Sequence, residues 1–269
     1  MFIGNQYLVS YFQELAKKQR LAHAYAFYGE EGVGKCCFAK QLAYFLERGL
    51  FDEPKHLLQD VLIIDGRNGI DAAREAKPFL WQAPVLGGKR IVILDNADEL
   101  NEQAQNSILK IIEEPPEHAL LLIIVRQPDN LLPALISRLQ KIYFGRVSDG
   151  EMRPATLAGQ VINKEILDFA AGRPGRLRIS QEDALYREAL KYSSQFLKTN
   201  GPQRSQMIKE LVELQKERPL ILDRFFEILI LELRKTPLRH TDLLRSVLSR
   251  LFYIKSYNTN KRLQLEAIS

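Results

Sequence analysis

The sequence predicts an α/β fold on a parallel β-sheet, followed by an all-helical C-terminal part, and three observations support it. Short apolar runs alternate with helical patterns over the first 145 residues, which is typical of a parallel sheet covered by helices on both faces. A glycine-rich motif separates the first such run from the helix that follows it. Beyond residue 183 no strand pattern persists.

The predicted elements follow one another in a regular order. Residues 5–19 have the spacing of an amphipathic helix, residues 22–28 are rich in strand-forming side chains, and residues 38–46 return to helical spacing. Four further strands are predicted at 61–65, 89–95, 119–125 and 141–144, with helices at 69–81, 101–114 and 131–139 between them. Pro115 and Pro116 end the helix at 101–114.

The region after residue 145 reads as helical. A short helix at 165–171 ends at Gly172, and residues 173–176 form a turn into another helix. Three prolines then punctuate helical segments, namely Pro202, Pro219 and Pro237. We therefore expect three domains, at residues 1–145, 146–182 and 183–269.

The glycine-rich motif, Gly-x-x-x-x-Gly-Lys at residues 29–35, has the form of a phosphate-binding loop. Gly29, Gly32 and Gly34 allow backbone N–H groups to turn toward phosphate oxygens, and Lys35 would reach the terminal phosphates. A strand before the loop and a helix after it support this interpretation over an ordinary glycine-rich turn. The next residue should carry the hydroxyl that holds Mg²⁺, but it is Cys36.

Two acids follow the predicted strand at 89–95. Asp95 ends this strand, where a carboxylate can hold Mg²⁺ through water beside a phosphate-binding loop. Many such sites use a second acid, usually Glu, to polarise the attacking water; here the candidate is Asp98, or Glu99. The alternative is that the strand-end aspartate only caps the helix after it.

Composition limits the remaining possibilities. The 269 residues carry a net charge of +5, and from Arg187 onward 16 Lys/Arg face 9 Asp/Glu. A basic last third suits DNA or an acidic partner, and equally suits helices with solvated Lys/Arg faces. The only cysteines, Cys36 and Cys37, are adjacent, so we expect no four-ligand zinc site. Without a signal pattern or an apolar run of about 18 residues, we expect a cytoplasmic protein that does not enter a membrane.

Several ordered motifs resemble one family. They are Leu-Ala-His-Ala-Tyr at 21–25, the phosphate-binding loop, Asp-Asn-Ala-Asp at 95–98, Asn-Ser-Ile-Leu-Lys-Ile-Ile-Glu-Glu-Pro-Pro at 106–116, Leu-Leu-Pro-Ala-Leu-Ile-Ser-Arg-Leu at 131–139, Gly-Arg-Pro-Gly-Arg at 172–176 and Asn-Thr-Asn-Lys-Arg-Leu-Gln-Leu-Glu at 258–266. Together they resemble the delta-prime subunits of the bacterial DNA polymerase III clamp loader, within the AAA+ ATPases. The resemblance spans nearly the whole chain.

This resemblance implies a role for each domain and for three arginines. The domains would be an AAA+ P-loop domain, a small helical lid and a helical collar for oligomerisation. Arg138, after Ser137, would be an arginine finger that acts on the ATP site of a neighbouring subunit; read alone, it could be a helix-end salt bridge. Arg126 and Arg176 would sense the nucleotide. The implied partners are ATPase subunits in a hetero-oligomeric ring, the sliding clamp, and primed DNA reached through the complex.

The chain also departs from the family. Residues 47–60 lack the four zinc-binding cysteines that the family often carries there, and Leu139 replaces the cysteine of the family's Ser-Arg-Cys motif. The resemblance implies ATP or ADP with Mg²⁺ as cofactors, but Cys36 argues against the metal and Asp98 is shorter than the usual Glu. We therefore expect weak or no ATPase activity from this chain itself.

Three functions remain to be compared. The first, which we favour, is a clamp-loader subunit of the DNA polymerase III holoenzyme that supplies Arg138 in trans. The second is a self-sufficient P-loop ATPase or nucleotide kinase. The third is a DNA-binding protein that uses its basic C-terminal part, which exposed aromatic side chains among the cations would favour. Because Phe225, Phe226, Phe252 and Tyr253 stand among Leu and Ile, we expect them in the core instead.

Overall fold

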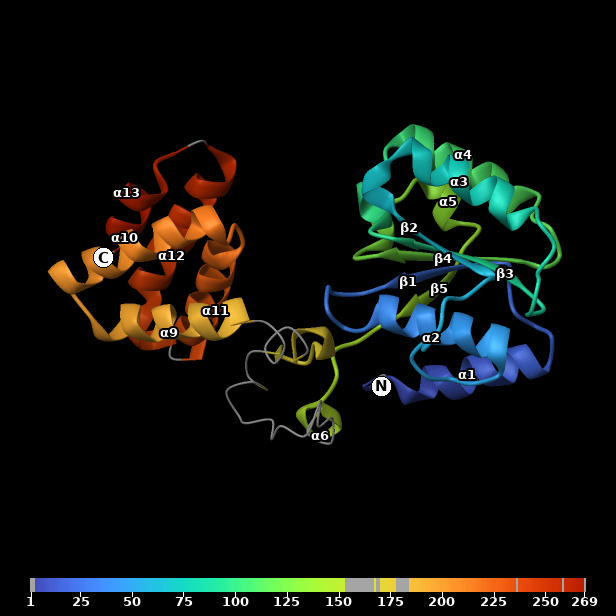
Figure 1. The fold of residues 1–269 in the computed structure, drawn as a ribbon, viewed down its shortest axis with the longest axis horizontal. Coiled ribbons are helices and arrows are strands. Elements are labelled where there is room, and N and C mark those ends of the chain that lie inside the picture. Colours follow the sequence, from blue (N-terminus) through green and yellow to red (C-terminus); the bar gives the residue numbers. More distant parts are fainter. Residues whose placement is uncertain are drawn as a thin grey trace. The chain divides into compact units, whose positions relative to one another are not determined.

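Five parallel strands form the sheet of the N-terminal part of the chain (Figure 1). This computed structural model describes residues 3–152, 167, 170–177, 184–235, 237–257 and 259–268. The strands are β1 (Ala24–Tyr28), β2 (Val61–Asp65), β3 (Arg90–Asp95), β4 (Ala119–Val125) and β5 (Gln140–Tyr143), in the spatial order β2-β3-β4-β1-β5. All four strand pairs are parallel, which confirms the predicted sheet.

Helices cover both faces of this sheet (Figure 1). On one face lie α1 (Gln6–Lys17) and α2 (Lys35–Arg48), and on the other lie α3 (Ile70–Leu80), α4 (Glu102–Glu113) and α5 (Pro133–Ile136). Alternate residues of β3 explain the arrangement: Ile91 and Ile93 pack in the first core with Phe38, whereas Val92 and Leu94 pack in the second with Ile108. Residues two apart on a strand share a face, so one strand supplies both cores.

The carboxyl ends of the strands meet at one edge of the sheet. In the parallel register Tyr28 of β1 pairs with Val125 of β4, and Asp65 of β2 pairs with Asp95 of β3. The segments that follow β1, β3 and β4 therefore leave from the same edge, which is where parallel sheets commonly bind ligands.

A second group of helices has its own core. These are α9 (Ala184–Lys198), α10 (Pro202–Glu217), α11 (Ile221–Lys235), α12 (Pro237–Ser256) and α13 (Lys261–Glu266). Buried side chains from α9, α10 and α11 pack together there, including Phe196, Leu211, Phe225 and Phe226. None of the helices in the described ranges is both long and apolar enough to cross a membrane.

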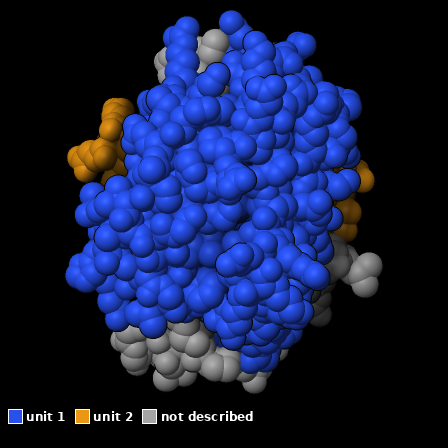
Figure 2. Space-filling view, turned by 90° about the vertical axis from the view of Figure 1, so that its right-hand side faces the viewer, with its two compact units in different colours: residues 1–162, 170–175 blue, residues 163–169, 176–269 orange. Residues whose placement is uncertain are grey.

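The chain forms two compact units, coloured separately in Figure 2. The first comprises residues 1–162 and 170–175, and the second comprises residues 163–169 and 176–269. This division groups the short helix α6 (Asp149–Met152) and residues 170–175 with the sheet. The three-domain division with boundaries at 145 and 182 stays a prediction, and the helix expected at 165–171 lies largely outside the described residues.

Two sequence expectations differ from the structure. The segment 131–139 is helical only over α5, because Leu132 donates its backbone N–H to the side chain of Gln105, and the chain must turn into β5 directly afterwards. Phe252 and Tyr253 are 58% and 42% exposed, so the expectation that they are core residues is wrong. They lie on α12, whose buried face is formed by other residues, such as Val247.

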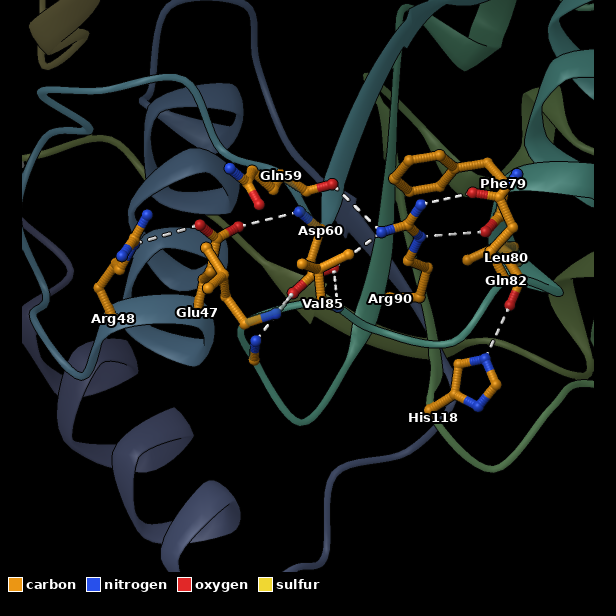
Figure 3. Close-up of polar contacts among 12 residues, drawn as sticks. Glu47, Arg48, Gln59, Asp60, Phe79, Leu80, Gln82, Val85, Arg90 and His118 are labelled. Carbon is orange, nitrogen blue, oxygen red and sulfur yellow. Dashed lines mark hydrogen bonds and ion pairs between the residues drawn. The ribbon is translucent and has the colours of Figure 1, made fainter.

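A buried ion pair organises the amino-terminal edge of the sheet (Figure 3). The carboxylate of Asp60, which is fully buried, accepts hydrogen bonds from the backbone N–H groups of residues 85–87 and from Arg90 Nη1 at 2.7 Å. Arg90 lies over the ring of Phe79 and donates to its carbonyl oxygen. Glu47 in turn accepts the backbone N–H of Asp60 at 3.0 Å. Carboxylates thus anchor the segment 47–60 to the sheet.

Candidate functional site

The glycine-rich loop connects β1 to α2, as the motif predicts. Its glycines adopt positive φ angles of 141° at Gly29, 85° at Gly32 and 102° at Gly34, a conformation that other residues rarely adopt. A Cβ atom on Gly29 would lie 2.3 Å from the carbonyl oxygen of Phe144, so a side chain cannot fit there. Gly29 also donates its N–H to the carbonyl of Arg126, which joins the loop to the end of β4.

Lys35 begins α2 and turns its ammonium group back into the loop. The Nζ atom donates to the carbonyl oxygens of Gly29 at 2.5 Å and Glu30 at 2.8 Å, and the residue is only 7% exposed. Burial lowers the pKa of Lys35, although the negative charges of Asp98 and Asp95 partly oppose this shift. The loop thus has the cation and the glycine conformations that a phosphate group requires.

Cys36 occupies the position of the metal-binding hydroxyl. Burial, together with the negative charge of the nearby Asp95 with which the thiol hydrogen-bonds, raises the pKa of its thiol to about 12. The Cys36 sulfur therefore stays protonated at neutral pH, and a neutral thiol is a poor ligand for Mg²⁺, which prefers oxygen. The residues present fit a phosphate group but do not fit the magnesium ion that usually accompanies it.

Asp98 holds the segment after β4 in place. Its carboxylate accepts the backbone N–H of Arg126 at 2.8 and 3.0 Å and the Nδ2 of Asn130 at 2.8 Å. Asp95, one turn earlier, accepts the N–H of Asn96 at 3.0 Å. Both predicted acids lie close enough to the loop to affect the pKa of Lys35. The carboxylate of Asp98 already accepts hydrogen bonds from Arg126 and Asn130, and these would compete with a water molecule for its oxygens.

Arg126 reaches the phosphate-binding loop. Its Nη2 lies 3.7 Å from a carboxylate oxygen of Glu31, and both side chains are largely exposed. The predicted sensor position thus lies beside Lys35 and the loop glycines, within one compact unit. Arg176 belongs to the other unit, where it forms an ion pair with Glu227 of α11. Its predicted role in nucleotide binding stays a prediction.

The sequence interpretation did not identify the contacts around Glu30. The carboxylate of this loop residue accepts two hydrogen bonds from Arg146, both 2.9 Å long, and lies 3.7 Å from Arg173. Gly175 donates its N–H to the carbonyl of Gly32 at 2.8 Å. The Gly-Arg-Pro-Gly-Arg motif at 172–176 is the feature of the sequence that could have indicated these contacts, because its residues Arg173 and Gly175 both contact the loop.

Arg138 follows α5 on the surface of the first unit. Its Nη1 donates to the carbonyl of Ala134 at 2.9 Å, and its Nη2 lies 3.1 Å from a carboxylate oxygen of Glu113. The side chains of Arg138 and Glu113 are each 43% exposed. No contact between Arg138 and the loop at 29–35 is recorded among the described residues. The guanidinium is thus held by α4 and α5 at a partly exposed position.

Metal ligands do not gather elsewhere in the described ranges. Within them, no group of three or more His, Cys, Asp and Glu residues is arranged to hold a metal ion. The expectation that the chain lacks structural zinc stays a prediction.

Known structures share this fold. A DNA polymerase III gamma subunit-related protein of Thermotoga maritima aligns with a TM-score of 0.57 and 22% identity, over 96% of this chain and 96% of that one. The RuvB Holliday junction branch migration motor of the same organism aligns with a TM-score of 0.50 and 16% identity, over 78% of this chain and 70% of that one. At these identities the likeness shows the fold alone.

Sequence comparisons are more specific. The chain is 28% identical over 214 residues to DNA polymerase III subunit tau of Bacillus subtilis, which covers 74% of this chain and 38% of that protein. It is 33% identical over 143 residues to DNA polymerase III subunit delta' of Pseudomonas aeruginosa, which covers 46% of this chain and 44% of that protein. Each match thus spans less than half of the relative's own length.

The sheet, the glycine-rich loop and its neighbouring acids all lie in one matched region. The model of the family described as "DNA polymerase III, delta subunit" matches residues 4–148. This region contains every strand of the sheet, together with Lys35, Asp95, Asp98, Arg126 and Arg138. Because the match covers more than half of the chain, the protein belongs to the DNA polymerase III delta subunit family.

Proposed function

We propose that this chain is a delta-prime-like subunit of a bacterial clamp loader. It would assemble in the cytoplasm with ATPase subunits in a hetero-oligomeric ring and help to load the sliding clamp onto primed DNA. The observation that carries the proposal is the family match over residues 4–148, which includes both an intact Ser137-Arg138 motif and an altered metal position at Cys36.

Within this proposal Arg138 acts on the neighbouring subunit. A guanidinium is planar and always charged, so it can stabilise the charge that develops on a transferring phosphoryl group. Arg138 is half exposed, and it follows the short helix α5 rather than the glycine-rich loop of its own chain. Both features support a role outside the subunit.

The chain's own nucleotide site plays a secondary part. Bound ATP would place its phosphates over the loop at 29–34, with Lys35 turned toward them instead of toward the carbonyls of Gly29 and Glu30. That exchange offsets the gain from phosphate contacts, and the Cys36 thiol offers no metal ligand. We infer that any bound nucleotide is hydrolysed slowly or not at all.

The proposal is tested by rebuilding the complex with ATPase subunits from the same organism. Arg138→Ala should leave folding and assembly intact and lower ATP turnover at the adjoining site by on the order of 10³. Total turnover need not fall to zero if other sites of the ring carry their own arginine fingers. Arg138→Lys should restore little, since an ammonium lacks the planar fork. Unchanged ATPase and clamp loading, with assembly verified, would show that Arg138 is a structural residue.

The alternative of a self-sufficient ATPase or kinase has its own test. The pure chain is assayed for ATP turnover beside its Lys35→Ala variant. We expect neither protein to hydrolyse ATP faster than buffer without protein, because the Cys36 thiol is neutral and the Asp98 carboxylate is engaged by Arg126 and Asn130. Steady turnover that disappears in Lys35→Ala would support the alternative.

A further inference from the structure

The carboxyl end of α4 carries acids where a helix favours cations. Glu113 is the last residue of α4, Glu114 follows it, and Pro115-Pro116 ends the segment. The carboxyl end of a helix carries partial negative charge, so a carboxylate there is unfavourable unless a cation lies beside it. Glu113 has such a cation, because Arg138 lies 3.1 Å away.

Arg138 is held from two elements at once. Glu113 of α4 contacts its Nη2, while the carbonyl of Ala134 in α5 accepts from its Nη1 at 2.9 Å and the Oγ of Ser137 lies 3.4 Å from the same nitrogen. Contacts at both terminal nitrogens favour one orientation of the guanidinium. An unrestrained arginine would lose its side-chain freedom on meeting its target, and that loss of entropy would weaken the interaction.

We propose that Glu113 is the positioning residue of Arg138, orienting its guanidinium toward the phosphates of the neighbouring subunit. This inference rests on the proposed function, in which Arg138 acts in trans. Glu113 itself touches no nucleotide; it acts through Arg138 by reducing the number of orientations that the guanidinium samples before the subunits meet.

The degree of exposure sets the size of the effect. An ion pair as exposed as Glu113 and Arg138 changes an equilibrium by roughly two- to fivefold. A contact of this strength can bias the guanidinium toward one orientation, and it is too weak to withhold Arg138 from a triphosphate. Loss of Glu113 should therefore weaken the finger without removing it.

The experiment compares five rebuilt complexes: wild type, Glu113→Gln, Arg138→Ala, the double variant Glu113→Gln/Arg138→Ala, and Glu114→Gln. Glutamine keeps the shape of Glu113 and removes its charge. Glu114→Gln is the matched control, because it removes the adjacent charge, for which no contact with Arg138 is recorded among the described residues. Assembly and thermal stability are measured for each chain before the kinetics.

We expect Glu113→Gln to lower, by roughly two- to fivefold, the part of kcat that Arg138→Ala removes. KM for ATP, assembly and melting temperature should not change, because Glu113 contacts neither nucleotide nor core. In the Arg138→Ala background the same substitution should have no further effect, since its partner is absent. Glu114→Gln should match wild type.

Three results would overturn the inference while the proposed function stands, provided that Arg138→Ala lowers turnover. The first is an unchanged kcat in Glu113→Gln. The second is an increased kcat, which would show that Glu113 holds Arg138 away from its target. The third is a further decrease of kcat in the Arg138→Ala background, which would show that Glu113 acts independently of Arg138. If Arg138→Ala itself changes nothing, the proposed function fails and the inference fails with it.

Discussion

At the scale of single residues, the position after Lys35 decides the chemistry of the loop. A hydroxyl there would lie beside Asp95 and complete a magnesium site. The Cys36 thiol keeps the same neighbour, and burial raises its pKa to about 12. The glycine-rich loop therefore keeps the form of a phosphate-binding loop, while the position of the metal-binding hydroxyl carries a neutral thiol.

The raised pKa of Cys36 predicts low reactivity. Only the thiolate attacks a disulfide reagent, and a shift from 9.0 to about 12 lowers the thiolate fraction at pH 8 by about a thousandfold. In a Cys37→Ser chain, the remaining thiol should react with Ellman's reagent at least about a hundredfold more slowly when folded than when unfolded in guanidinium chloride. Folded and unfolded rates within a few fold of each other would contradict the predicted environment.

At the scale of elements, the ion pair between Asp60 and Arg90 connects the start of β2 and β3 to the loop at 82–88. Burial by itself raises the pKa of Asp60, but hydrogen bonds from Gly87, Val85, Leu86 and Arg90 outweigh it and hold the pKa below its ordinary value. A buried carboxylate with this many donors stabilises the folded state as long as it stays ionised.

Removal of Asp60 should be costly. Asp60→Ala leaves Arg90 buried without its partner, and we expect a loss of about 3–5 kcal/mol in the free energy of unfolding at pH 7, measured with urea. Because the folded-state pKa is lowered, the difference from wild type should stay constant down to about pH 5 and shrink as pH falls below 3.8.

A nearby surface carboxylate provides the control for this prediction. Asp52 is exposed in the same segment, so Asp52→Asn should change stability by less than about 0.5 kcal/mol. Equal losses in the two variants, or a difference that closes between pH 7 and pH 5, would argue against a buried and ionised Asp60.

At the scale of the whole molecule, the two compact units have separate cores. The second unit buries Phe196, Phe225, Phe226 and Leu229 among its own helices. A fragment of residues 176–269 should therefore fold alone, with a helical circular dichroism spectrum and one cooperative thermal transition. A fragment without a cooperative transition would show that this core depends on the sheet unit.

Stability should also be independent of zinc. Cys36 and Cys37 are the only thiols, and carboxylates anchor residues 47–60. The melting temperature of the intact chain should not change with 1,10-phenanthroline, and elemental analysis should find well under one zinc per chain. A melting temperature that falls with the chelator, or about one bound zinc, would refute this prediction.

Much of the fold follows from local sequence. The four strands after β1 match the predicted ranges within one residue, and for β2, β3 and β4 the signal is a short run rich in β-branched residues, too short for a typical helix. The glycine-rich loop was also predicted, because its motif is contiguous in the sequence. The structure explains one of its glycines: a side chain at Gly29 would collide with the carbonyl of Phe144. Phe225 and Phe226 were correctly expected in the core.

The tertiary structure decided what depends on residues distant in sequence. Which face of α12 is buried is set by the helices packed against it, so the local pattern misplaced Phe252 and Tyr253. The pairing of Arg138 with Glu113 requires α4 and α5 to meet, and the contacts of Glu30 with Arg146 and Arg173 join loops far apart in the chain. The sequence by itself determined the strands, the loop and the family motifs, because these depend on local periodicity and backbone conformation. Side-chain partnerships across elements depend on how those elements pack, which no local pattern encodes.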